Sequence, residues 1–191
     1  MTRYDRLLAV VLVGAVIASA AVVPRPAFAA SAAEIDRDAT AALKRLYELQ
    51  PAARRLGKEA VAVLVFPHMV KAGFLFGGQL GEGAMRKGNL LNGGKTVGYY
   101  NSVAASYGLQ AGIQEFGYAL FFMNDAALAS LNSREGFEVG VGPSVVLVDQ
   151  GMGKSITSST LTEDIYAFIF SQKGLMAGMG IQGSKITKID K

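Results

Sequence analysis

Downstream of residue 30, apolar side chains first recur with the spacing of a helix. Ser31 and Glu34 fit a capping box, with the acid three residues after the cap. The pattern that follows predicts an amphipathic helix that ends near Gln50. Pro51 suits the first turn of a second, short helix, which we expect Gly57 to end. The apolar positions of the first helix are Ile35, Ala39, Ala42, Leu43, Leu46 and Leu49.

From residue 61 onward the pattern changes to short apolar runs interrupted by glycine. Val61 to Phe66 is a β-branched, fully apolar run that predicts a buried strand, which Pro67 is expected to end. A turn rich in Asn and Gly at residues 89–94 predicts a hairpin between two strands. The other strands are expected over residues 74–80, 83–88, 96–100, 103–122, 137–148 and 174–189.

Two short helices are expected among these strands, over residues 125–131 and 163–172. Runs of strands with helices mostly at one end favour an α+β fold built on an antiparallel sheet. The chain has 23 glycines, yet 51% of its residues are hydrophobic, which argues against disorder. Glycine within strand-like runs indicates bends, bulges or close backbone approach. We therefore expect a curved, barrel-like sheet with an N-terminal amphipathic helix.

Residues 1–29 have the layout of a secretory signal peptide. Two early arginines precede an apolar run at 7–23, and Ala27 and Ala29 supply the small residues of a cleavage site. Residues 30–32, Ala-Ser-Ala, offer a second possible site. A retained membrane helix is the alternative, because the run reaches the lower limit for spanning a bilayer, about 17–25 residues. The chain has no cysteine, which excludes disulfides and acylation as a lipoprotein. We expect an exported protein of the periplasm or cell envelope, soluble or peripheral at a membrane.

Nucleic-acid and nucleotide binding lack support in the sequence. The formal net charge of +4 is too small for a nucleic-acid surface. Lys95 and Lys154 invite a P-loop interpretation, but Asn89 and Val148 occupy the position of its first glycine. Residues 178–183 match Gly-x-Gly-x-x-Gly, with no room after them for the helix and strand of a dinucleotide fold.

Catalytic and metal sites lack support as well. His68 is the only histidine, and no Gly-x-Ser-x-Gly element accompanies it. With one histidine and no cysteine, a zinc site is not expected. Asp149, Glu163 and Asp164 could bind a hard cation, but solvated acids in turns are the favoured interpretation. We expect no enzyme, no cofactor and no metal.

Three sequence blocks carry a resemblance to a known family. Residues 66–83, 107–112 and 172–183 are similar, in this order, to the opening, middle and closing signatures of the SYLF domain family. The match spans about residues 58–186, so residues 30–57 are expected to form a helical segment packed with residues 58–191 as one unit. The resemblance implies lipid binding; eukaryotic members bind phosphoinositides, and a yeast branch also binds actin.

This chain departs from the family in one element. A Trp-Ser-x-Pro element often follows the first hairpin, whereas residues 97–101 read Val-Gly-Tyr-Tyr-Asn and the chain has no tryptophan. The pattern is similar to that of exported bacterial members, for which actin is not an expected partner. The resemblance therefore implies the fold and a capacity for lipid or membrane contact.

Cations within or near the signature blocks are the candidates for an anionic headgroup. Lys71 lies in the first block and Lys173 in the last, and both are expected at the surface. The alternative for each cation is a solubilising surface charge, and most aromatic residues are expected in the core. A non-catalytic domain that favours anionic lipids is the leading hypothesis, and a structural or protein-interaction module of the cell envelope is the alternative. The candidate residues are Lys71, Lys173, Arg54, Arg55, Lys58, Phe74 and Phe76.

Overall fold

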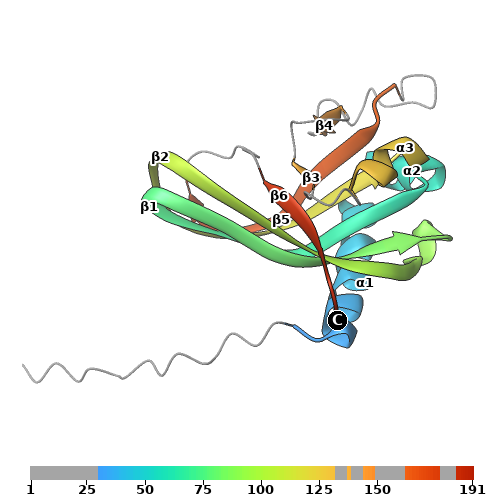
Figure 1. Ribbon diagram of the computed structural model, residues 1–191, viewed down its shortest axis with the longest axis horizontal. Helices are drawn as coiled ribbons and strands as arrows, with labels where there is room; N and C mark the ends of the chain where they lie inside the picture. The colour runs from blue at the N-terminus through green and yellow to red at the C-terminus, as the bar shows by residue number, and fades with distance from the viewer. Residues whose placement is uncertain (1–29, 132–136, 139–143, 149–161, 177–183) are drawn as a thin grey trace, which may run out of the picture.

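The computed structural model describes residues 30–131, 137–138, 144–148, 162–176 and 184–191, and only the backbone of residues 74–76, 106–111 and 175–176. Helices and one mostly antiparallel sheet confirm the α+β fold (Figure 1). The helical elements are α1 (Ala32–Leu49), α2 (Pro51–Glu59), the 3₁₀ turn η1 (Leu90–Asn92) and α3 (Asp125–Leu131). The strands are β1 (Ala62–Lys87), β2 (Lys95–Phe122), β3 (Phe137–Glu138), β4 (Val145–Leu147), β5 (Ile165–Met176) and β6 (Lys185–Ile189).

The sheet is organised around the long antiparallel pair β1 and β2. β1 lies along one edge of β2 from the η1 hairpin to Phe122. On the other edge of β2, β6 pairs with residues 99–103 and β5 pairs with residues 112–122. Short β3 extends the sheet beyond β6, and β4 runs parallel to β5. Figure 1 shows β1 and β2 running together to one end of the molecule and back, which gives the sheet its strong curl.

The two halves of β1 contact each other where the curled sheet closes. A Cβ atom on Gly83 would lie 2.5 Å from the Val65 carbonyl oxygen, and one on Gly81 would lie 2.8 Å from that of His68. Only residues without a side chain allow such an approach of two backbone segments. The glycines of the first signature block therefore make the closure of the sheet possible.

Alternating side chains of the strands form two cores. Val63, Val65 and Phe121 belong to the helix-side core, which packs against α1 and α2. Leu64 and Phe122 belong to the inner core, which lies on the opposite face of the sheet. Because the strands bury both faces, their apolar runs are nearly continuous rather than alternating with polar residues.

A network of polar contacts positions α1 on the sheet. Arg86 of β1 is buried and lies 3.6 Å from the Asp36 carboxylate. The same carboxylate accepts hydrogen bonds from the Thr96 hydroxyl at 2.6 Å and the Tyr99 hydroxyl at 3.0 Å. Burial, followed by the hydrogen bond and charge of Asp36, raises the pKa of Tyr99. The tyrosine therefore remains a neutral donor at physiological pH.

Several predictions of local structure are confirmed. The capping box between Ser31 and Glu34 forms in full at the start of α1. The Asn- and Gly-rich turn contains η1 and ends on Gly93 in the left-handed conformation. The short helix predicted over residues 125–131 is α3, although Asn124 rather than Asp125 caps its backbone.

Three predictions are wrong, and tertiary contacts explain each. α2 continues through Gly57, which packs against the Tyr47 side chain instead of ending the helix. Pro67 does not end β1, because a bulge between Phe66 and Met69 accommodates it. The helix predicted over residues 163–172 is largely strand β5, whose side chains alternate between the two cores.

Candidate functional site

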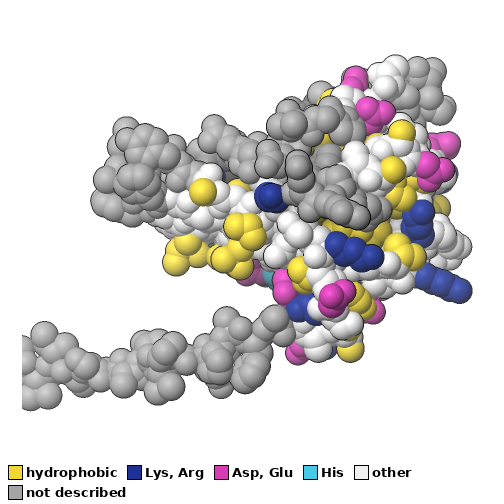
Figure 2. All heavy atoms as spheres, in the orientation of Figure 1, with side chains coloured by type: hydrophobic (Ala, Val, Ile, Leu, Met, Phe, Trp, Pro, Cys, Tyr) yellow, Lys and Arg dark blue, Asp and Glu magenta, His cyan; other side chains and the backbone are white. Residues whose placement is uncertain are grey.

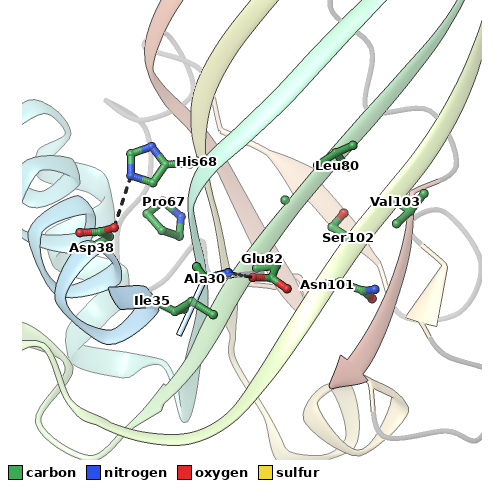
Figure 3. Close-up of a pocket in the computed structure, with 11 residues that line it drawn as sticks. Ala30, Ile35, Asp38, Pro67, His68, Leu80, Glu82, Asn101, Ser102 and Val103 are labelled. Atoms are coloured by element: carbon green, nitrogen blue, oxygen red, sulfur yellow. Dashed lines mark hydrogen bonds and ion pairs between the residues drawn. The ribbon is translucent and has the colours of Figure 1, made fainter. Parts of the chain in front are cut away.

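Two adjoining cavities open between α1 and the curled sheet. The first has a volume of about 450 Å³ and lies between the start of α1 and the outer side of β1 and β2 (Figure 3). The second has a volume of about 620 Å³ and lies between the middle of α1 and strands β2 and β5. Asp38, Pro67 and His68 line both cavities. We call the two cavities together the α1 groove.

Irregular backbone next to the second cavity makes room for it. The β1 bulge carries Pro67 and His68 into the groove, and the register between β2 and β5 shifts between Glu115 and Gly117. Ser171 of β5 has φ 53°, a left-handed conformation that is rare for residues other than glycine. Bulges bend strands and re-aim side chains, so these irregularities separate the sheet from α1 at this point.

His68 connects helix and sheet at the junction of the cavities. Its Nδ1 lies 2.7 Å from Oε1 of Glu115 on β2, and its Nε2 lies 3.8 Å from Oδ2 of Asp38 on α1. Asp38 also pairs with the exposed Arg37 at 3.0 Å. The junction of the groove is therefore polar and contains both signs of charge.

The first cavity has an exposed apolar wall. Leu80 and Val103 are paired neighbours on β1 and β2, and they are 62% and 52% exposed (Figure 3). Val70 and Ile113 are further exposed apolar residues of the same two strands. Figure 2 shows exposed apolar side chains on the side of the β1–β2 arm that faces α1. Such residues, gathered beside a cavity, mark a surface suited to an apolar partner.

The second cavity has a cationic end. Arg45 of α1 and Lys173 of β5 both line it, and both are exposed. Of the candidate residues predicted from the sequence, Lys173 lies in the α1 groove. Arg45, Leu80 and Val103 were missed by sequence reasoning. The helical spacing of Asp38, Ala42 and Arg45 indicates that the three residues share one face of α1. That spacing alone does not show that this face lies opposite β5.

Lys71 is not at the surface, and that prediction is wrong. Its side chain is only 5% exposed. The bulge at Pro67 changes the alternation of β1, so that Lys71 shares the inner face of the sheet with Met69. Lys71 therefore does not contribute to the α1 groove.

The candidates on α2 do not join Lys173. Arg54, Arg55 and Lys58 are exposed on α2, and Arg54 lines a third cavity of about 400 Å³ beside the η1 turn. The side chains of Phe74 and Phe76 lie outside the described part of the structure, although the backbone of both pairs with β2.

A metal-ligand cluster and a membrane-spanning helix are both absent from the described residues. They contain no group of three or more His, Asp or Glu side chains that could hold a metal ion. No helix among them is both long and apolar enough to cross a membrane.

The comparison with protein families gives a match that agrees with the resemblance seen in the sequence. Residues 103–191 match the family Ysc84, described as Las17-binding protein actin regulator. The match covers the second and third signature blocks, at residues 107–112 and 172–183, together with Lys173. No curated protein matches the chain significantly. Residues 103–191 of this chain are therefore similar to the Ysc84/SYLF family, whose members are non-catalytic binding domains associated with lipid binding and actin regulation.

Proposed function

We propose that this protein is a non-catalytic domain that binds a lipid with an anionic headgroup in the α1 groove. The observation that carries the proposal is the polarity of the groove, which is apolar beside Leu80 and Val103 and cationic beside Arg45 and Lys173. An amphiphile needs both kinds of surface within one continuous site. The acyl chain would lie at the first cavity and the headgroup at the second.

The apolar end supplies the larger part of the expected binding energy. Covering exposed apolar surface contributes roughly 25 cal/mol per Å². Leu80 and Val103 have over half of their surface available, whereas Ile35, behind them in the first cavity, is buried in the helix-side core. An acyl chain over these residues would complete an apolar surface that the protein itself leaves open.

The cationic end supplies the preference for anionic lipid. A cation near an anionic membrane contributes on the order of 1 kcal/mol, and salt screens this attraction. Asp38 pairs with Arg37, and Glu115 contacts the His68 ring, whereas Arg45 and Lys173 lie at the cationic end of the groove and could act on a headgroup. The proposed site is therefore selective for charge, but only moderately strong.

Vesicle co-sedimentation tests the proposal. An Arg45→Glu, Lys173→Glu double variant is expected to lose roughly tenfold or more in affinity for anionic vesicles, because two attractions become repulsions. Binding of the wild type should weaken with salt as the screening length falls from about 10 Å at 0.1 M to about 3 Å at 1 M. The matched control is Arg54→Glu, Lys58→Glu on α2, which changes the charge equally outside the groove.

The two double variants separate the site from the overall charge. Equal loss in both would mean that net charge alone attracts the protein to vesicles, and the groove would then have no special role. Absence of pelleting under every condition would favour the alternative function, a protein-interaction module of the cell envelope.

We also propose that the protein is exported and that its mature chain begins at Ala30. The signal-peptide layout of residues 1–29 motivates this proposal. It is supported by contacts at Ala30, whose backbone nitrogen lies 3.1 Å from Glu82, while Lys191 contacts both the Glu82 carboxylate and the Ala30 carbonyl at 2.9 Å. A free α-ammonium group at Ala30 would form an ion pair with Glu82.

Mass determination of the protein from its native envelope fraction tests the start of the mature chain. We expect the mass of residues 30–191, and a Glu82→Gln variant should unfold at a slightly lower temperature because the terminal ion pair is lost. A mass that includes Met1 or Thr2 in membrane-extracted protein would show a retained anchor instead.

A further inference from the structure

The inner face of the curled sheet carries a buried polar cluster, and among its members Ser102 also lines the first cavity of the α1 groove. Its members are more than nine-tenths buried, and none is used by the function proposed above. Met69 and other inner-core residues border it along the strands. We define the inner polar cluster as Lys71, Gln79, Ser102, Gln114 and Ser184.

The closure of the sheet brings the two halves of β1 together at this cluster. The contact of Gly81 with Met69 places these residues opposite each other across the interior. Side chains of a strand return to the same face every second residue. Lys71, two residues after Met69, and Gln79, two residues before Gly81, therefore face the same interior from opposite walls.

The neighbouring strands add the other three members. Gln114 is the direct β2 partner of Lys71. Ser102 is the β2 partner of Gly81, diagonal to Gln79, and it is also the partner of Ile186 on β6. Ser184 precedes Ile186 by two residues and is buried like it. Diagonal neighbours on one face lie about 7–8 Å apart, within reach of a shared small ligand.

Three polar atoms of the cluster lack a hydrogen-bond partner in the part of the chain that the structure describes. They are Oε1 of Gln114, Oγ of Ser102 and Oγ of Ser184. A buried polar group without a partner costs about 1–3 kcal/mol, so native proteins keep few of them. Apolar side chains of similar size would avoid this cost, because they would pack against an inner core that is itself apolar. The unpaired atoms therefore point to a polar molecule between the walls.

The chemistry of the cluster favours an oxyanion. It combines one ammonium, two amides and two hydroxyls, all of which can donate hydrogen bonds. Lys71 already takes part in an interaction, but an ammonium has three donors and can serve a second partner. The carboxylates of Glu82 and Glu115 lie at strand positions that face the outer side of the sheet. There Glu82 contacts Lys191 and Glu115 contacts His68. The five residues of the cluster thus supply an ammonium group and further donors, and none of the five is a carboxylate.

We propose that the inner polar cluster binds a phosphate group. The same chemistry serves a soluble phosphate ester and the phosphate of a lipid headgroup, and the proposal does not depend on lipid binding in the α1 groove. Lys71 would supply the charge, while the hydroxyls of Ser102 and Ser184 and the amide of Gln114 would donate to the phosphate oxygens.

Titration of the full-length protein with sn-glycerol 3-phosphate, monitored by thermal unfolding and calorimetry, tests the proposal. Ligand that binds only the folded state must raise the unfolding temperature. We expect a saturable rise in the wild type and at least about tenfold weaker binding in Lys71→Met, which keeps the length of the side chain. Lys173→Met, which removes an equal charge at the surface, should leave the affinity within about twofold.

A second variant keeps the proposal testable if Lys71→Met fails to fold. Ser102→Ala removes one hydroxyl with little change in volume and is expected to fold and to bind several times more weakly. Vesicles containing phosphatidic acid distinguish the two sources of phosphate. Competition between these vesicles and glycerol phosphate would assign the site to a lipid headgroup. Binding of the soluble ester alone would assign the site to a free metabolite. An unfolding temperature unchanged by either ligand in the wild type would overturn the proposal, as would equal affinity in wild type and Ser102→Ala.

Discussion

Replacement of Asp36 by alanine is expected to destabilise the protein by about 2–4 kcal/mol. The carboxylate is the shared partner of the buried Arg86, of Thr96 and of Tyr99. Loss of the Asp36 carboxylate leaves the Arg86 guanidinium with one fewer anionic partner. It also removes the hydrogen bonds that Thr96 and Tyr99 donate to this charged acceptor. Removing one partner of a buried ion pair costs about 3–5 kcal/mol, and the value is lower here because Asp36 is 37% exposed.

Equilibrium unfolding in urea measures this effect. Asp38→Ala is the matched control, because Asp38 lies on the same helix but pairs with the exposed Arg37, and exposed pairs contribute at most about 1 kcal/mol. Similar midpoints for both variants would show that the Asp36 network does not hold α1 on the sheet.

Gly83→Ala is expected to cost about 2–4 kcal/mol, because the closure of the sheet leaves no room for a methyl group at this position. The added carbon would lie 2.5 Å from the Val65 carbonyl oxygen and 2.7 Å from the Phe66 ring. A backbone oxygen cannot move aside as a flexible side chain can, so the two halves of β1 would have to separate. The inner core lies between these halves and would lose packing with them.

Gly78→Ala on the same strand provides the control. Its added carbon would meet only the Ala104 carbonyl oxygen at 3.7 Å, an ordinary contact. This change is expected to be neutral or to stabilise by up to about 1 kcal/mol, since alanine restricts the unfolded chain. The account of sheet closure would be wrong if the two alanine variants had the same free energy of unfolding.

Features that depend on neighbouring residues could be predicted from the sequence. The capping box of α1 and the turn at η1 each depend on residues within a few positions of one another. The antiparallel, glycine-bent character of the sheet follows from composition and from the spacing of apolar residues. These local signals suffice for the fold class and for the N-terminal helix.

Features that depend on distant pairing could not be predicted. Pro67 usually ends a strand, but the partner β2 continues past it and holds β1 in the sheet through a bulge. The same bulge turns Lys71 inward, which no local pattern reveals. Residues 163–172 resemble a helix locally, yet burial against both cores makes them part of a strand.

The candidate site was predictable only in part, for the same reason. Lys173 could be chosen from its place in the closing block, but its neighbour across the groove, Arg45, belongs to a helix far away in sequence. Leu80 and Val103 are unremarkable within apolar runs, and only the register between β1 and β2 makes them an exposed pair.

The most direct test of lipid binding in the α1 groove is the fluorescence of a single introduced tryptophan. The chain has no tryptophan, so Leu80→Trp adds a unique probe at the apolar wall, and Val97→Trp adds one at an exposed apolar position outside the groove. We expect a blue shift of the Leu80→Trp emission on addition of anionic vesicles, reduced by Arg45→Glu, Lys173→Glu, and little change for Val97→Trp. An unchanged Leu80→Trp spectrum in vesicle-bound protein, or an equal shift at both positions, would contradict the account.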